Sequence, residues 1–228
     1  MTDYARREHH DFLNAAGQAL ADPPLQEALI RLTDTLLAGN RRGYAALADS
    51  SDLRDHAKRI KEHALAHLDR YLVQLEESVL RHGGHVHWAA TAEDARQIIL
   101  DVADETGCKR IVKSKSMTTE EVHLNPALEA AGLEVTETDF GEFIIQLAGE
   151  RPSHLVAPAV HHTRESIARI LSKHTGEELP DEPAPLAKTG RRLLREKFAR
   201  ADMGITGANF AVAETGTVVL ISNEATPG

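Results

Sequence analysis

The pattern of apolar residues changes once along the chain, at Gly83 and Gly84, and this change limits the folds that the sequence can adopt. Before the glycines, apolar residues recur every three or four positions over residues 53–80, which predicts one long amphipathic helix. A weaker helical pattern covers residues 25–37. After the glycines, short apolar runs alternate with capped helical segments, the rhythm of a parallel sheet covered by helices. The sequence therefore predicts a helical N-terminal arm over residues 1–84 and an α/β domain over residues 85–228.

Four strands are predicted in the α/β domain, and helices follow them. The strands cover residues 85–89, 110–113, 133–138 and 155–160. The residues predicted to cap helices are Thr91, Thr118 and Thr163. The expected fold class is α/β, with a parallel-rich sheet and helices on both faces.

The last third of the chain adds a helix and a hairpin to this pattern. Basic residues surround an apolar side over residues 188–200, which predicts a helix with a cationic face. The β-rich runs 210–213 and 217–221 flank a glycine turn and predict a hairpin. No helix follows the second run, so we expect the natural protein to continue beyond Gly228.

Composition excludes several classes of function. The formal net charge of -9 argues against binding to nucleic acid. No apolar run approaches the length of a membrane span, and the polar N-terminus does not resemble a secretory signal, so a cytoplasmic location is expected. A single cysteine, Cys108, cannot supply the four thiolates of an iron-sulfur cluster. The histidines show no zinc-binding spacing, so no metal site is predicted.

A cationic loop follows the predicted strand 110–113. It contains Lys113, Ser114, Lys115 and Ser116, two cations and two hydroxyls directly before a helix. This combination suits the binding of a small carboxylate or a phosphate. The alternative is a polar loop that only caps the helix.

Three further polar loops supply candidate catalytic groups, because loops at the carboxyl ends of parallel strands gather at one edge of a sheet. Asp139 and His161 could accept a proton from a hydroxy acid, and Glu142 could bind its hydroxyl group. A turn aspartate and a solvated histidine are the alternatives. The loops at the final hairpin add a further set of candidates. They are Glu214 as nucleophile or base, with Thr215 and Asn223 as binding residues.

Four stretches resemble the domain shared by lactate utilization proteins B and C, and the B type most closely. The resemblance lies in residues 113–117 (KSKSM), 137–147 (ETDFGEFIIQL), 152–161 (PSHLVAPAVH) and 204–217 (GITGANFAVAETGT). The stretches follow one another in order and at intervals similar to those of the family. After them, Asn223 and Glu224 begin a stretch similar to an Asn-Glu-Gly motif, but three residues intervene before Gly228.

The resemblance implies a Rossmann-like sheet akin to the glucosamine-phosphate isomerase, ribose-phosphate isomerase and CoA transferase group. It implies a subunit of the system that oxidises L-lactate to pyruvate, with A and C type subunits as partners. Full-length B type proteins carry [4Fe-4S] clusters in cysteine-rich motifs after this domain, whereas no cofactor is expected in this chain.

Three hypotheses follow for the function of the domain. It binds a small carboxylic acid through Lys113 and Lys115, or it is a non-catalytic scaffold that docks partner subunits through the helices over 53–80 and 188–200. The third hypothesis, an acyl or CoA transferase or a sugar-phosphate isomerase that uses Glu214, rests on fold analogy alone.

Overall fold

The computed structural model describes residues 3–150 and 157–221 and divides the chain into two compact units. The first unit consists of Met1–Lys61 and Val160–Thr163. The second consists of Glu62–Ala159 and Arg164–Gly228. The boundary at Lys61 falls inside the stretch predicted as the helical arm, and the sheet lies in the second unit.

The first unit is built from α1 (Asp3–Leu20), α2 (Pro23–Ala45) and most of α3 (Ser50–Ala66). The helix predicted over residues 25–37 is confirmed as part of α2. This helix begins earlier because the Asp22 side chain accepts a hydrogen bond from the Leu25 amide (3.2 Å) and proline occupies the first turn.

The single helix predicted over residues 53–80 is wrong at one point. It is broken at His67 into α3 and α4 (Leu68–Arg81). His67 has φ −129° and ψ 32°, and its Nδ1 lies 2.9 Å from the carbonyl oxygen of His63. Apolar spacing continues through the break, so periodicity alone could not reveal it.

A three-stranded parallel sheet forms the centre of the second unit, in the order β2-β1-β3. The strands are β1 (Arg110–Lys113), β2 (Glu134–Glu137) and β3 (Met203–Ile205). The first two confirm the predicted strands 110–113 and 133–138. The third was not predicted, because three residues that include a glycine give almost no alternation to detect.

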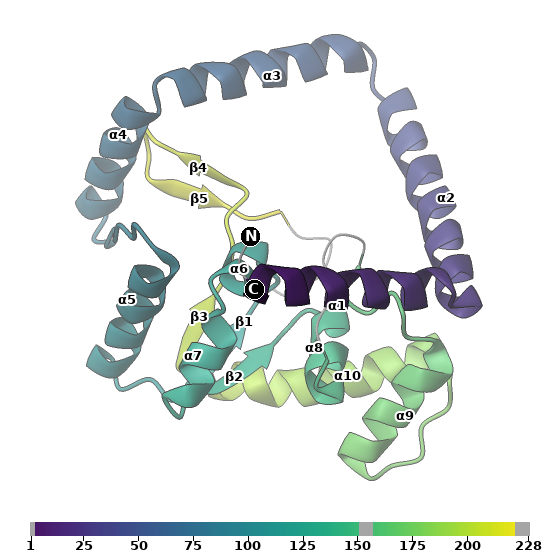
Figure 1. Ribbon diagram of the computed structural model, residues 1–228. Helices are drawn as coiled ribbons and strands as arrows, with labels where there is room; N and C mark the ends of the chain where they lie inside the picture. The colour runs from purple at the N-terminus through teal and green to yellow at the C-terminus, as the bar shows by residue number, and fades with distance from the viewer. Residues whose placement is uncertain (1–2, 151–156, 222–228) are drawn as a thin grey trace. The chain divides into compact units, whose positions relative to one another are not determined.

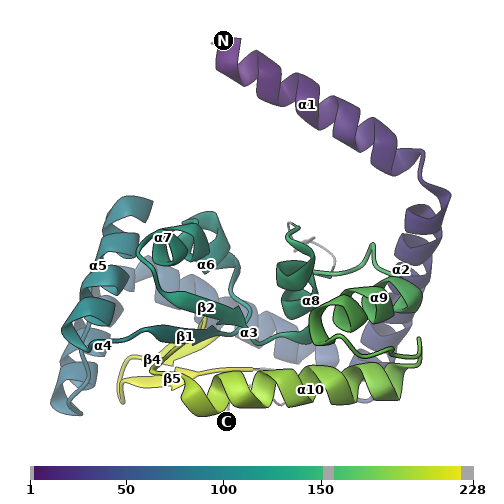
Figure 2. The ribbon, with the colours of Figure 1, turned by 90° about the horizontal axis from the view of Figure 1, so that it is seen from below.

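Helices cover the sheet on both faces, which confirms the α/β fold class. On one face, α5 (Ala92–Glu105) and α7 (Leu124–Ala130) pack apolar side chains against Ile111 and Val135 of the strands. Figure 2 shows α10 (Pro183–Arg200) on the opposite side of β1 from α7. A second core cluster joins α10 to α8 (Phe140–Ala148) and α9 (Arg164–Thr175).

Two predicted strands are not observed in the described residues. Residues 85–89 have no regular structure, and Trp88 donates a hydrogen bond to Glu76 of α4 instead (3.2 Å). Of residues 155–160, the first two lie outside the described residues, and 157–160 include a turn but no strand. Alternation and apolar runs predict an extended backbone, but they do not reveal whether a neighbouring strand is present to pair with it.

In place of the one helix predicted to be capped by Thr118, the structure has two helices, α6 (Met117–Glu121) and α7. Ser116, rather than Thr118, caps the first of them. His123 adopts a left-handed backbone (φ 52°) between them. Pro126 explains the break, because it cannot donate a backbone hydrogen bond inside a helix but is tolerated in the first turn of a new one.

The predicted hairpin is confirmed as β4 (Phe210–Val212) and β5 (Thr217–Val219), which pair antiparallel. Figure 1 shows this hairpin reaching to α4. Ser78 of α4 is fully buried and donates hydrogen bonds to the carbonyl oxygens of Ala213 (2.8 Å) and Glu214 (3.1 Å). The hairpin is therefore packed on a helix of the same unit.

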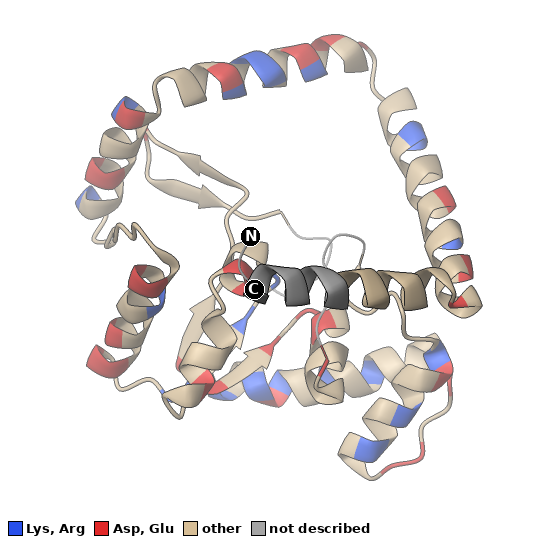
Figure 3. Ribbon diagram, viewed as in Figure 1, with Lys and Arg blue, Asp and Glu red and all other residues tan. Residues whose placement is uncertain are grey.

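Figure 3 shows acidic and basic residues interspersed along α3 and a mainly basic α10. Two of the cations of α10 already have partners. Arg192 forms two 2.8 Å hydrogen bonds with Glu177, and Lys197 pairs with Glu134 of β2. Among the helices of the described residues, none combines the length and the apolar character needed to cross a membrane.

Candidate functional site

The carboxyl ends of the three parallel strands meet at one edge of the sheet, as predicted. Ser114, after β1, donates its hydroxyl hydrogen to Thr206, after β3 (2.7 Å). Thr138, after β2, donates its backbone amide (2.9 Å) and its hydroxyl (3.1 Å) to the Lys113 carbonyl oxygen. The loops after β1, β2 and β3 are thus joined directly by hydrogen bonds.

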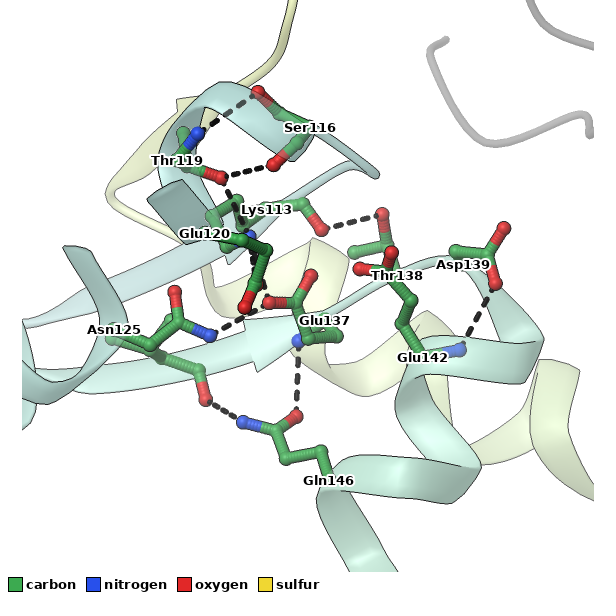
Figure 4. A network of polar contacts seen from close by, with 11 residues as sticks. Lys113, Ser116, Thr119, Glu120, Asn125, Glu137, Thr138, Asp139, Glu142 and Gln146 are labelled. Carbon is green, nitrogen blue, oxygen red and sulfur yellow. Dashed lines mark hydrogen bonds and ion pairs between the residues drawn. The ribbon is translucent and has the colours of Figure 1, made fainter. Parts of the chain in front are cut away.

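Lys113 is the centre of a buried charged network at this edge (Figure 4). Its side chain is 0% exposed. Its Nζ lies 2.8 Å from Oε1 of Glu137 and 3.4 Å from Oε1 of Glu120, and donates to the Thr119 hydroxyl at 3.0 Å. A substrate carboxylate would therefore compete with two glutamates for this ammonium group.

Glu137 is held in place by polar side chains from two helices. Asn125 of α7 donates to Glu137 Oε1 (2.7 Å). Gln146 of α8 accepts from the Glu137 amide (3.0 Å) and donates to the Val135 carbonyl oxygen (2.8 Å). Because the backbone is fixed on both sides, the Glu137 carboxylate has a defined position beside Lys113.

Glu142 adds a third carboxyl group to the network, and only 3% of the residue is exposed. One carboxylate oxygen from each of Glu120, Glu137 and Glu142 lies within 4.8 Å of the other two. Burial, and next the charge of Glu137 and a hydrogen bond with it, raise the pKa of Glu142 to about 8, although Lys113 acts in the opposite direction. The network can therefore hold a proton at neutral pH.

Two predicted site residues cap helices at this edge. Asp139 Oδ1 accepts from the Glu142 amide (3.0 Å) at the start of α8, and Ser116 accepts from the Thr119 amide (3.4 Å) at the start of α6. Both residues are buried. Capping accounts for these side chains without a ligand, and a catalytic role for Asp139 stays a prediction.

Glu214 and Thr215 lie at the hairpin turn instead. Glu214 is exposed, and Thr215 donates its hydroxyl hydrogen to Thr217 (2.8 Å). A Cβ atom on Gly216, which has φ 73°, would lie 2.9 Å from the Val79 amide nitrogen of α4. In the described residues no hydrogen bond or ion pair connects this turn to the Lys113 network, and the turn has an evident packing role.

The remaining predicted residues lie in other positions. His161 belongs to the first unit, where its ring is 4.4 Å from that of His162. Lys115 is exposed in the loop after β1. Asn223 lies outside the described residues. The structure therefore gathers Lys113, Ser114 and Ser116 with Asp139 and Glu142, and it does not add the hairpin residues to them.

Four members of the network were not predicted as site residues. They are Thr119, Glu120, Asn125 and Glu137. A signal for Glu137 was present, because it lies at the end of a predicted strand as Lys113 does, and the two are register partners in adjacent parallel strands. The other three lie on helices, and their convergence depends on the break at His123.

The same stretches that build this edge identify the family. A family model described as the LUD domain matches residues 72–228, which include the whole sheet and the charged network. The chain belongs to the LUD domain family. No solved structure matches it.

Several curated proteins are similar to this LUD chain over most of its length. An "Uncharacterized electron transport protein YkgF" of Escherichia coli K12 is 44% identical over 94% of this chain. "Lactate utilization protein B" is 44% identical over 93% of the chain in Bacillus pumilus and 41% identical over 93% in Bacillus cereus strain AH820. The chain spans 45% of the length of each of these relatives.

The cysteine content does not fit an iron-sulfur cluster in this LUD chain. Cys108 is buried, and its Sγ lies 3.8 Å from the Arg110 carbonyl oxygen. Burial raises the pKa of its thiol, which disfavours the thiolate that would bind iron. The chemistry available at the sheet edge is instead that of carboxyl groups, hydroxyls and one buried ammonium.

Proposed function

We propose that this LUD chain is part of a lactate utilization system of the B type, which oxidises L-lactate to pyruvate. The observation that carries the proposal is identity of 41–44% with proteins named lactate utilization protein B over 93% of the chain. The name of the Escherichia coli relative, an electron transport protein, agrees with an oxidation that passes electrons to a carrier. Any [4Fe-4S] clusters of such a system would be held outside these residues.

We propose that the domain contributes the site for the small acid, at the shared edge of the three strands. Ser114 and Thr206 present hydroxyl groups there, and Lys115 presents an exposed cation beside them. An α-hydroxy acid needs donors for its carboxylate and a polar partner for its hydroxyl. Lys115 would attract the carboxylate, whereas Lys113 stays paired with Glu137.

Binding can be measured on the chain itself by calorimetry with L-lactate and pyruvate. Lys115→Ala is expected to weaken binding about tenfold, which corresponds to about 1.4 kcal/mol. Lys58→Ala in α3 is a matched control, because it also removes an exposed lysine but lies in the first unit. No heat with either acid at millimolar concentration would refute acid binding by the isolated chain.

A chimera tests the role in lactate utilization. In a Bacillus cereus strain that lacks its lactate utilization protein B, the 213 matching residues of that protein would be replaced by this chain. We expect growth on L-lactate to return. A chimera that accumulates to the level of the native protein without restoring growth on L-lactate would contradict the proposal.

We also propose that A and C type subunits bind this chain, as a scaffold function would require. The exposed basic side chains Arg191 and Arg195 of α10 are the candidate contacts, since Arg192 and Lys197 already pair within the chain. The double substitution Arg191→Glu and Arg195→Glu should abolish co-purification with either subunit in the chimera. Unchanged co-purification would exclude this surface.

A further inference from the structure

One oxygen of the charged network is buried without a hydrogen-bond donor. Glu137 Oε1 receives both the Lys113 ammonium (2.8 Å) and the Asn125 amide (2.7 Å). Glu137 Oε2 is buried and has no hydrogen-bond partner among the described residues. A buried carboxylate oxygen that lacks a donor is costly, so a nearby group with a hydrogen to donate is needed.

The group positioned to donate is the carboxyl of Glu142. It projects from the first turn of α8 into the network, and one of its oxygens lies within 4.8 Å of an oxygen of Glu137. An ionised Glu142 could only accept, but a protonated Glu142 has one O–H to donate. Protonation would thus satisfy Glu137 Oε2 and remove one buried charge.

The charges around the pair favour the same state. The titratable groups that face it are Lys113 of β1, Glu120 of α6 and Asp139 at the start of α8. If all four carboxyls were ionised, one ammonium would face four negative charges in a largely buried site. The raised pKa of Glu142 has the same causes, burial and the charge of Glu137.

We propose that Glu137 and Glu142 share one proton and form the acid–base pair of the domain, which exchanges this proton with the oxygen of a small hydroxy or keto acid. The proposal rests on the proposed function. It concerns a proton transfer alone. Aspartate or glutamate pairs of this kind titrate as a unit, with one proton held well above the ordinary carboxyl range.

The transfer balances without a redox step inside this chain. When the ionised pair acts as base, the O–H bond of the substrate hydroxyl breaks and an O–H bond to a carboxylate oxygen of the pair forms. The electron pair stays on the substrate oxygen. In the reverse direction, the protonated pair gives its proton to that oxygen. Glu120 has an oxygen within 4.8 Å of the pair, and its side chain is 32% exposed.

The proton is detected by carbon-13 NMR of the chain labelled at its glutamate carboxyl carbons. We expect one resonance to titrate near pH 8, to disappear in Glu142→Gln, and to move to lower pH in Glu137→Gln, where the neighbouring charge is absent. Glu121→Gln, an exposed neighbour of Glu120, should leave it unchanged. If every glutamate titrates below about pH 6, or if the high resonance survives in Glu142→Gln, the shared proton is refuted.

The acid–base role is tested in the lactate-growth chimera with Glu142→Gln. Glutamine can still donate to Glu137 but cannot exchange a proton, so growth on L-lactate should be lost although the variant is at least as stable as the unsubstituted chain in thermal unfolding at pH 7. Normal growth of this variant would overturn the acid–base role even if the NMR result holds. Failure of the unsubstituted chimera would instead count against the proposed function, and the NMR titration would still decide the shared proton.

Discussion

The Lys113 network and the hairpin turn at Gly216 look alike in the sequence, since each is a short polar motif beside a β-rich run, but they are built by different forces. At the network, charged side chains from β1, β2 and α8 are buried together, and the half-buried Glu120 of α6 joins them. At the turn, the side chains of Glu214 and Thr215 stay exposed, and the backbone packs against Ser78 and Val79. A polar motif in the sequence can therefore indicate either a charged site or a close backbone contact. The two are distinguished by whether the polar side chains are buried.

The largest effect is expected from Lys113→Met, which leaves Glu137 buried without its cation. Removal of one partner of a buried ion pair typically costs about 3–5 kcal/mol of unfolding free energy. Chemical denaturation measures the loss. Lys115→Met, at an exposed position in the same loop, should change the unfolding free energy by no more than about 0.5 kcal/mol.

A double variant sharpens this result. Lys113→Met combined with Glu137→Met removes both charges, so it should cost less than Lys113→Met alone. If the double variant were the less stable of the two, the network would not be held together by charge.

The stability of the hairpin contact should depend on the size of the side chain at the turn and not on its charge. Gly216→Ala places a methyl group 2.9 Å from a backbone atom of α4 at φ 73°, and we expect a loss of about 2–3 kcal/mol. Gly107→Ala is a matched control, with φ 64° but open space around the new atom, and should cost about 1 kcal/mol. Equal losses would show that backbone conformation, and not the approach to α4, explains the glycine.

Ser78→Ala tests the same contact from the side of the helix. The substitution removes the donor to the Ala213 and Glu214 carbonyl oxygens, and we expect a loss of about 1–2 kcal/mol in thermal or chemical unfolding. Combined with Gly216→Ala, the losses should not add, because both substitutions loosen one interface. Strict additivity would mean that the two sites are independent.

The most gradual effect is the dependence of the unfolding free energy on pH that arises from Glu142. In the unfolded chain Glu142 loses its proton near pH 4.5, and in the folded chain near pH 8. Between these pH values the folded chain binds more protons than the unfolded chain. The contribution of Glu142 to the unfolding free energy therefore decreases as the pH rises from 4.5 to 8. Only one proton is involved, so the slope cannot exceed about 1.4 kcal/mol per pH unit.

Glu142→Gln should flatten this slope and make the chain more stable than the unsubstituted one at pH 8. Unfolding at pH 5 and pH 8 measures the difference. Gly107→Ala should keep the slope of the unsubstituted chain, because it changes no charge. An unchanged slope in Glu142→Gln would assign the pH dependence to other groups.

The sequence predicted the parts of this fold that depend on neighbouring residues. The strands at 110–113 and 133–138, the hairpin and α9 were found because alternation and capping are local signals. The extra strand β3 and the break at His67 were missed, since pairing and helix ends depend on contacts outside the segment. The same holds for the site. Lys113 and Glu142 were predicted because they lie in or beside loops that follow predicted strands. Glu120 and Asn125 were missed because only the three-dimensional arrangement of α6 and α7 brings them to Lys113 and Glu137.

The register of β1 and β2 has a consequence for assembly of the sheet. Lys113 lies opposite Glu137, and both are turned into the interior. A shift of one strand by a single residue would turn its side chains to the other face and leave a lone charge in an apolar core. The two strands are only four residues long, too short for hydrophobic contacts alone to select one alignment strongly, so the charged pair discriminates against misaligned sheets during folding.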